Sequence, residues 1–374
     1  MKKLGLLLLC AVLVIGQPIA AEALSVSAKY ACVLDAQTGK ILYEKNAYDR
    51  HSMASTTKIM TALVALERGN TEDVVTVSKN AAGTEGSSIY LKAGEKITLG
   101  DLLYGVMLAS GNDAAIAVAE HIGGSVSGFA DLMNQKAKEI GAKNTQFKNP
   151  NGLDEEGHYT TAYDLALITK EALANPKFTE IASTWNKKIS NGEESYLRVL
   201  TNHNKLLKQY EGCIGVKTGY TKKTGRCLVS AAERDNLRLI AVTLSAPDDW
   251  RDHTNMLNDA FSKYSAKPMI LKDMEIKTVP VISGDKERIR LLAEDDFYTS
   301  GVDDKDWSLD ISVPENVPAP IKQGTALGTL KILYQGKLMK EIRLCAEEDV
   351  TFVEPPKKTF GDHIRGILLC WLGM

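Results

Sequence analysis

Cysteines, an excess of one charge and metal-ligand patterns would each indicate a particular class of protein, and all three are scarce or missing in this sequence. Only 6 of its 374 residues are cysteines, and one of them, Cys10, lies in an N-terminal apolar run. The odd, sparse set that is left does not form a disulfide framework, and whether Cys213 pairs with Cys227 or both stay free thiols is left open. Lysine and arginine (45) nearly balance aspartate and glutamate (47), so nothing predicts a nucleic-acid partner. The 6 histidines lack metal-ligand spacing such as His-Glu-x-x-His, and we predict neither a metal nor another cofactor.

Apolar runs long enough to cross a membrane are also missing, because a spanning helix needs about 20 apolar residues. Residues 1–23 combine a basic start, an apolar run over residues 4–15 and a small-x-small triplet that ends at Ala23. This pattern is typical of a secretory signal peptide that is cleaved after Ala23. The sequence therefore predicts an exported protein.

The C-terminal residues 355–374 show a helical pattern of apolar side chains at steps of three and four, which places them on one face. The tract is too short to span a bilayer. Trp371 and the preceding Lys357 and Lys358 suit a membrane interface. We expect a linker and an amphipathic helix that attaches to a membrane surface; the alternative is a helix docked on the protein's own body.

Most of the remaining chain predicts one α/β (α+β) domain over residues 24–268. Residues 29–44 favour a β-hairpin, and a mostly helical stretch runs from residue 54 to about residue 175. Strand patterns return after residue 190, and a closing helix is expected at 251–264. This order predicts an antiparallel sheet that joins the first and last strands, flanked by helices and carrying an inserted helical lobe.

A change of composition marks a second domain, which we expect at residues 269–354. Short alternating strands dominate it and helical patterns are few, so it should be all-β. The segment Tyr334-Gln335-Gly336-Lys337 reads as a hairpin turn. No cluster of catalytic residue types lies in this part of the sequence, which favours a spacer or a docking platform.

Ser55 and Lys58 are the first candidates for chemistry. Three residues apart at the start of a helical pattern, their side chains share one face. A serine hydroxyl needs an adjacent base, and a lysine amine is one when desolvation or a cationic neighbour lowers its pKa. A serine at a helix start also leaves its backbone N–H free to bind an oxyanion. The pattern alone is weak, because Ser283-x-x-Lys286 matches it too.

Two further motifs follow along the chain. Ser110-Gly111-Asn112 lies between two helical patterns, where a short loop would present a hydroxyl and an amide to a cleft; Ser78-Lys79-Asn80 has the same form. Lys-Thr-Gly occurs at 217–219 and again at 223–225. The first copy follows apolar, strand-like residues, whereas the second reads as a turn between two strands. We therefore expect the first copy to line the cleft.

Ser55-x-x-Lys58, Ser110-x-Asn112 and Lys217-Thr218-Gly219 occur in that order, each in the kind of element that the chemistry requires. Together they resemble the penicillin-binding protein and serine β-lactamase superfamily. More closely, the chain is similar to the low-molecular-weight D-alanyl-D-alanine carboxypeptidases of the type-5-like S11 peptidases. The stretches that carry this resemblance are LDAQTGKILYEKNAY, ASTTKIMTALVALE, MLASGNDAAIAVAEH, FKNPNGLDEEGHYTTAYDLALI, GVKTGYT with GRCLVSAAER, and PIKQGTALGTLKI. They cover essentially the whole mature chain.

The resemblance implies that Ser55 is the acylated nucleophile and Lys58 its base. Ser110 would relay a proton to the leaving group, and Asn112 would hold the substrate backbone. The backbone N–H groups of Ser55 and Tyr220 would form the oxyanion hole. The implied reaction removes the terminal D-alanine from peptidoglycan pentapeptide stems, and penicillin and other β-lactams would acylate the same serine.

The resemblance also implies how the substrate is held. Lys217 and Thr218 would meet the terminal carboxylate of the peptide, and Gly219 would let the strand approach it closely. Arg251, which opens the predicted closing helix, corresponds to an arginine near the carboxylate pocket. His203 departs from the family pattern because it stands where arginine is frequent, which leaves open how the stem peptide is held.

The implied partners are a stem peptide ending in D-Ala-D-Ala, β-lactam antibiotics, and the outer face of the bacterial cytoplasmic membrane. A class A β-lactamase would ordinarily carry Ser-Asp-Asn at residues 110–112 and would lack the β domain and the tail; Glu155 or Glu156 would be its candidate deacylating base. A D,D-endopeptidase would use the same site to cut cross-links. An inactive peptidoglycan-binding module is disfavoured because every catalytic side chain is present.

Overall fold

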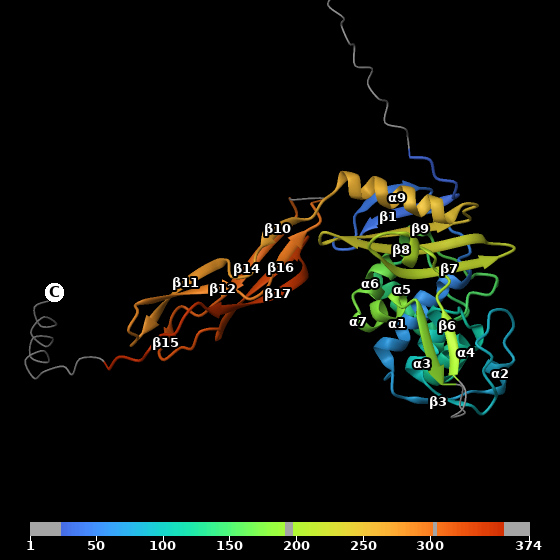
Figure 1. The fold of residues 1–374 in the computed structure, drawn as a ribbon, viewed down its shortest axis with the longest axis horizontal. Helices are drawn as coiled ribbons and strands as arrows, with labels where there is room; N and C mark the ends of the chain where they lie inside the picture. The colour runs from blue at the N-terminus through green and yellow to red at the C-terminus, as the bar shows by residue number, and fades with distance from the viewer. Residues whose placement is uncertain (1–23, 191–196, 302–304, 355–374) are drawn as a thin grey trace, which may run out of the picture.

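The computed structural model describes residues 24–190, 197–301 and 305–354. The predicted signal peptide (1–23) and the predicted linker and amphipathic helix (355–374) lie outside these ranges. The described chain forms an α/β domain followed by an elongated β domain (Figure 1). Within those ranges, no helix combines the length and apolar character needed to cross a membrane.

A five-stranded antiparallel sheet organises the α/β domain. Its spatial order is β2-β1-β9-β8-β7. The strands are β1 (Tyr30–Asp35), β2 (Ile41–Lys45), β7 (Cys213–Thr221), β8 (Gly225–Arg234) and β9 (Leu237–Leu244). The prediction that the first and last strands share one sheet is confirmed. Since β7 lies at the edge, one of its sides faces the helices rather than another strand.

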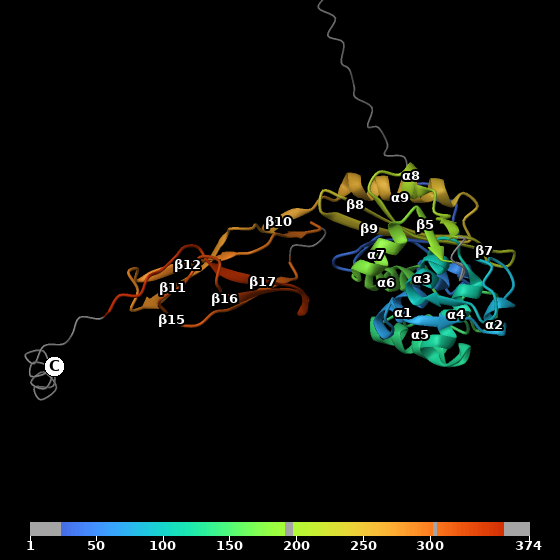
Figure 2. The ribbon, with the colours of Figure 1, turned by 60° about the horizontal axis from the view of Figure 1, so that its bottom comes forward.

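Helices cover both faces of this sheet (Figures 1 and 2). On one face lie α9 (Asp249–Lys263) and α8 (Leu206–Gln209), where Met256 and Leu257 share a core with Leu228. The helical lobe packs on the other face around α1 (Lys58–Arg68), which is buried along most of its length. The remaining helices of the lobe are the 3₁₀ helix η1 (Ala54–Thr57), α2 (Lys79–Ala82), α3 (Leu99–Met107), α4 (Asn112–Gly123), α5 (Val126–Ile140), α6 (Ala162–Leu173) and α7 (Pro176–Ser183).

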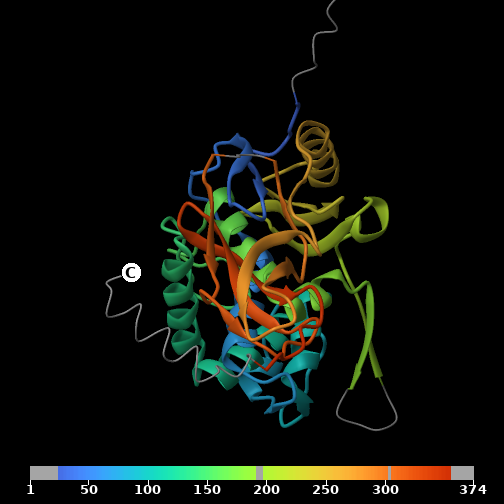
Figure 3. The same ribbon diagram turned by 90° about the vertical axis from the view of Figure 1, so that its left-hand side faces the viewer.

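Two short antiparallel ribbons complete this domain. One pairs β3 (Val74–Thr76) with β4 (Lys96–Thr98), and the other pairs β5 (Asn186–Ser190) with β6 (Leu197–Thr201). Figure 3 shows the second ribbon in yellow-green, extending from the sheet alongside the lobe. Arg198 of β6 forms an ion pair with Glu95 and donates to the carbonyl of Tyr90 at 3.0 Å. The ribbon thereby holds the loop that precedes β4.

The second domain is all-β, as predicted, and has its own apolar core. A six-stranded sheet has the order β14-β16-β17-β12-β11-β15, and β10 pairs with β13. At the predicted hairpin turn Tyr334 pairs with Lys337, and Gln335 and Gly336 both have positive φ, as a two-residue type I′ turn requires. The strands are β10 (Lys267–Ile270), β11 (Glu275–Ile282), β12 (Arg288–Ala293), β13 (Phe297–Thr299), β14 (Trp307–Ser312), β15 (Val317–Pro318), β16 (Ala326–Tyr334) and β17 (Lys337–Ala346).

The side-chain amide of Gln37 joins the two domains. Gln37 lies in the turn between β1 and β2, and its Nε2 donates to the carbonyl of Tyr298 at 2.6 Å. Its Oε1 accepts from the N–H of Ser300 at 2.8 Å. One side chain therefore satisfies a backbone donor and a backbone acceptor of the other domain.

Candidate active site

Ser55 lies in η1, and Lys58 is the first residue of α1. The helical pattern therefore begins as one 3₁₀ turn that carries the serine, before the α-helix proper. Lys58 Nζ donates to Ser55 Oγ at 3.0 Å, so the two side chains share a face and are in hydrogen-bond contact. The start of η1 also has an unusual backbone, because Ala54 has a φ of 46°.

Lys58 is fully buried and makes three hydrogen bonds. Besides Ser55 Oγ, its Nζ donates to Asn112 Oδ1 at 2.7 Å and to the carbonyl of Asn151 at 2.6 Å. Burial lowers the pKa of Lys58 well below its ordinary value, and the nearby charge of Lys217 lowers it further, against an opposing effect of Asp113. A lysine that loses its proton readily can act as the base for a serine in direct contact.

The loop between α3 and α4 places Ser110 and Asn112 beside this pair. Ser110 has a φ of 59°, in the left-handed region, and is almost wholly buried. Asn112 uses both groups of its amide within the protein: Oδ1 accepts from Lys58, and Nδ2 donates to the carbonyl of Glu85 at 2.7 Å. Its backbone N–H donates to the carbonyl of Ser87 at 2.6 Å. These hydrogen bonds hold the loop to Lys58 of α1 on one side and to the carbonyls of Glu85 and Ser87 on the other.

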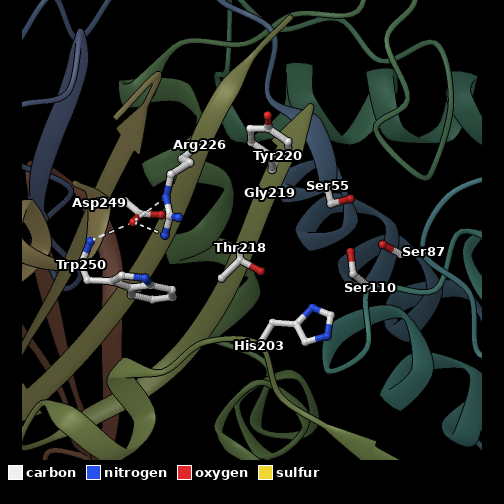
Figure 4. A pocket seen from close by; sticks show the side chains of 10 residues that line it. All are labelled: Ser55, Ser87, Ser110, His203, Thr218, Gly219, Tyr220, Arg226, Asp249 and Trp250. Atoms are coloured by element: carbon white, nitrogen blue, oxygen red, sulfur yellow. Dashed lines mark hydrogen bonds and ion pairs between the residues drawn. The ribbon is translucent and has the colours of Figure 1, made fainter. Parts of the chain in front are cut away.

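The first Lys-Thr-Gly lies on the edge strand β7, against η1 (Figure 4). Lys217 is 1% exposed, and its Nζ donates to the carbonyl of Thr218 at 2.9 Å. Burial lowers the pKa of Lys217 to about 7. A Cβ at Gly219 would lie only 3.0 Å from the backbone nitrogen of Ser55, which explains why glycine suits the closest approach of the strand to the serine.

A cavity of about 580 Å³ opens between β7 and the helical lobe. Figure 4 shows the hydroxyls of Ser55, Ser110 and Ser87 along one wall, with Thr218 and His203 facing them. The residues that line it are Ser55, Ser87, Ser110, His203, Thr218, Gly219, Tyr220, Arg226, Asp249 and Trp250. Burial, and then the charge of Lys217, lower the pKa of His203, which favours its neutral form.

The structure does not bring Arg251 to this cavity. Its side chain is exposed, and the preceding residues of the helix, Asp249 and Trp250, line the wall instead. The cation that lines the cavity is Arg226 of β8, which the sequence reasoning passed over. The available signal was the position of Arg226 directly after the second Lys-Thr-Gly, because that places it across from Tyr220 in the β7–β8 pair.

The carbonyl of Asn151 was also missed, although its loop is prominent in the sequence. Ser55 Oγ lies 3.5 Å from this oxygen, and Lys58 donates to it. The loop is held to η1 by His158, whose Nε2 lies 2.8 Å from Thr57 Oγ1, and burial lowers the pKa of His158 to about 4. Glu155 accepts from Asn149 at 2.9 Å and lines a different cavity, away from Ser55.

The second copies of the Ser-x-Asn, Ser-x-x-Lys and Lys-Thr-Gly motifs lie in other environments. Ser78 caps α2, with its Oγ accepting from the N–H of Ala81 at 2.9 Å. Ser283 lies in the β domain, where its carbonyl accepts from the N–H of Val353. Lys223 is exposed in the turn between β7 and β8.

Cys213 and Cys227, whose pairing the sequence left open, do not form a disulfide. Cys213 and Cys227 are free thiols, and burial raises their pKa values to about 11 and about 12. In the described part of the chain, no group of three or more His, Cys, Asp or Glu side chains is placed to hold a metal ion.

The sheet with its helical lobe, and a serine–lysine pair facing an edge-strand Lys-Thr-Gly, define a penicillin-binding type of serine acyl-transfer site. Family comparison is specific: residues 17–248 match the model for D-alanyl-D-alanine carboxypeptidase of peptidase family S11, and residues 264–351 match the C-terminal domain of penicillin-binding protein 5. The chain belongs to the S11 D-alanyl-D-alanine carboxypeptidase family.

Two curated relatives match over nearly the whole length of the chain. The chain is 40% identical over 359 residues to the D-alanyl-D-alanine carboxypeptidase DacF of Bacillus subtilis, covering 90% of each chain. It is 33% identical to DacC of Escherichia coli, covering 88% of this chain and 86% of that protein. Among solved structures, penicillin-binding protein 5 of Haemophilus influenzae is similar with a TM-score of 0.62 at 29% identity, covering 87% of this chain and 98% of the other. A Streptomyces K15 DD-transpeptidase variant is similar with a TM-score of 0.60 at 34% identity, covering 64% and 99%.

Proposed function

We propose that this protein removes the terminal D-alanine from peptidoglycan pentapeptide stems through an acyl-enzyme on Ser55. The observation that carries the proposal is the 3.0 Å contact between Ser55 Oγ and the Nζ of a fully buried Lys58. In the neutral form, Lys58 takes the hydroxyl proton as Oγ attacks the carbonyl between the two D-alanines. The other contacts of Nζ, to Asn112 and Asn151, hold it in place for this transfer.

The backbone N–H groups of Ser55 and Tyr220 bind the oxyanion that forms on the attacked carbonyl. The closeness of Gly219 to Ser55 N supports this pairing of the two segments. Ser110 relays a proton to the nitrogen of the leaving D-alanine, and a water molecule then hydrolyses the ester on Ser55. Asn112 contributes by positioning Lys58, since its side-chain oxygen accepts from that amine.

The substrate ends in a carboxylate. Thr218 of β7 lines the cavity, and the buried Lys217 directly precedes it on the same strand. A bound carboxylate beside Lys217 would favour the charged lysine and so offset its burial. Neither candidate base of the class A β-lactamase alternative lines the cavity at Ser55, since Glu155 lies at another cavity and Glu156 is exposed. β-Lactams, which carry a carboxylate next to a reactive amide, would acylate Ser55 in place of the peptide.

Incubation with a labelled penicillin, followed by mass mapping of the acylated peptide, tests the assignment. The label should lie on the peptide that contains Ser55, and the same preparation should release D-alanine from a peptide ending in D-Ala-D-Ala. Label elsewhere, or release without acylation of Ser55, would contradict the proposal.

We also propose that residues 1–23 direct export, that residues 24–268 form the catalytic domain, and that residues 269–354 serve as a spacer or a docking platform. Residues 355–374 would attach the enzyme to the outer face of the cytoplasmic membrane. Deleting residues 357–374 should then yield a soluble enzyme with near-native turnover. A truncated protein that still sediments with membranes would mean that another part of the chain attaches it.

A further inference from the structure

Arg226 stands beside the cavity on the same face of the sheet as Thr218. It pairs with Tyr220 across β7 and β8, and Thr218 pairs with Leu228 two residues further along. Paired residues of antiparallel strands project to the same face, and so do residues two apart. Figure 4 shows the guanidinium of Arg226 next to Trp250, on the side of Thr218 away from Ser55.

Asp249 fixes this guanidinium. Arg226 Nε and Nη2 donate to Asp249 Oδ1 at 3.0 Å and 2.7 Å. The Asp249 side chain is only 4% exposed, whereas that of Arg226 is 45% exposed. Both residues line the cavity, but the guanidinium is the more exposed member of the pair and the carboxylate is largely shielded from solvent. The guanidinium carbon lies over the ring of Trp250, 6.0 Å from the ring centroid.

Arg226 is the permanent cation among the ten residues that line this cavity. Lys217 lies behind the wall, nearly fully buried, and with a pKa of about 7 it is uncharged in a large fraction of the free enzyme at neutral pH. His203 has a lowered pKa and is neutral there as well. An anionic group that enters the cavity consequently meets its lasting positive charge at Arg226.

We propose that Arg226, held by Asp249, is a specificity-determining residue that recognises the terminal carboxylate of the substrate beyond Thr218. The inference rests on the function proposed above. A guanidinium presents a planar fork of donors that matches a carboxylate, and it stays charged at every physiological pH. The ligand class is therefore a peptide with a free C-terminal carboxylate, as opposed to an amidated or extended one.

The test compares two N-acetylated tripeptides, one ending in D-Ala-D-Ala with a free carboxylate and one with the C-terminal amide. Arg226→Gln should lower kcat/KM about tenfold for the free acid, mainly through KM, because a charge-assisted hydrogen bond at a half-exposed site is lost. For the amide the change should be within about twofold, since no carboxylate is present to be recognised. The loss of kcat/KM that Arg226→Gln causes on the free-acid peptide should become larger above pH 7, where Lys217 loses its proton.

Matched variants separate recognition from folding. Arg226→Lys keeps the charge without the fork and should recover part of the loss. Arg226→Gln combined with Asp249→Asn leaves no buried carboxylate unpaired and should show the same discrimination as Arg226→Gln alone. Arg234→Gln is the control at the other end of β8, where the guanidinium stacks on Tyr210 and Phe261, and it should change neither substrate.

Equal losses on both peptides would mean that Arg226 acts only through the fold, and an unchanged kcat/KM would mean that it has no part in recognition. Either result overturns the inference. Acylation of wild-type Ser55 by penicillin and release of D-alanine report separately on the proposed function. If both occur while Arg226→Gln leaves the preference for the free acid intact, the inference alone fails.

Discussion

The two copies of Lys-Thr-Gly differ in their surroundings and not in their residues. Lys217 is buried against the helical lobe on the edge strand β7, and its amine has a partner and a lowered pKa. Lys223, six residues later in the same hairpin, is exposed in the turn. The two Ser-x-x-Lys motifs differ in the same way, since Lys58 is buried against Ser55 whereas Lys286 forms a surface ion pair with Glu348. Burial with partners gives these residues their chemistry, because charges in a water-poor site interact far more strongly than charges in solvent.

The sharpest test of this comparison uses the serines. Ser55→Ala should abolish both penicillin labelling and release of D-alanine, because no other group in contact with Lys58 can form the ester. Ser283→Ala should leave both activities intact. Intact-protein mass after incubation with penicillin decides between them, and acylation that persists in Ser55→Ala would break the comparison.

The lysines should give the next largest effect. Lys217→Ala removes a charged contact in a buried site and should cost about 2–4 kcal/mol of transition-state stabilisation, or roughly 30- to 1,000-fold in kcat/KM. Lys223→Ala should change turnover by no more than a few-fold, because the lysine is solvated. Release of D-alanine is the measurement. Equal losses of kcat/KM in both variants, or a larger loss in Lys223→Ala, would mean that the active copy of Lys-Thr-Gly has been assigned wrongly.

The sequence predicted which segments meet at the site but not all of the contacts. The order of the three motifs and the periodicity around Ser55 and Lys217 were enough to place a helix, a loop and an edge strand, and the structure has these elements. Arg251 shows the limit of that reasoning: a step of one residue along a helix turns the side chain by about 100°. Asp249 and Trp250 consequently face the cavity, whereas Arg251 points to solvent.

The missed contacts depend on tertiary packing, which local patterns do not encode. The carbonyl of Asn151 reaches Lys58 only because a distant loop folds under η1. The hairpin register places Arg226 across from Tyr220, but its pairing with Asp249 follows from how α9 closes on the sheet.

The pH dependence of kcat/KM should also distinguish the buried Lys217 from the exposed Lys223. Lys217 must be charged to meet the substrate carboxylate, and its pKa in the free enzyme is about 7. Because kcat/KM reports on the free enzyme, it should fall about fivefold between pH 7 and 9 on a free-acid peptide, with Arg226 limiting the fall. The fall in kcat/KM between pH 7 and 9 should persist in Lys223→Ala and should disappear in Lys217→Ala. A wild-type profile that is flat over this range would mean that Lys217 keeps its proton.

The smallest effect on turnover is expected at His253, a buried group with partners that lies outside the cavity. Its Nδ1 lies 2.5 Å from Ser230 Oγ and its Nε2 lies 2.9 Å from Thr243 Oγ1, so α9 is tied to β8 and β9. Burial lowers the pKa of His253 from 6.5 to about 3. Between these values the unfolded chain binds a proton that the folded protein does not, so stability falls as the pH falls through this window. The expected slope from this group is about 1.4 kcal/mol per pH unit, measured by urea unfolding between pH 6.5 and 4.

Other groups also titrate in this window, and His253→Gln isolates the contribution of the histidine. A glutamine amide can still donate and accept between the two hydroxyls, but it binds no proton, so the variant should unfold with a shallower dependence on pH. Turnover at neutral pH should change little, because neither His253 nor its hydrogen-bond partners Ser230 and Thr243 line the cavity. An imidazole signal of His253 that titrates near pH 6 in the folded protein would show that burial does not hold this group neutral. Burial alone would then not explain the lowered pKa values of the buried lysines, since the side chain of His253 is as fully buried as that of Lys58.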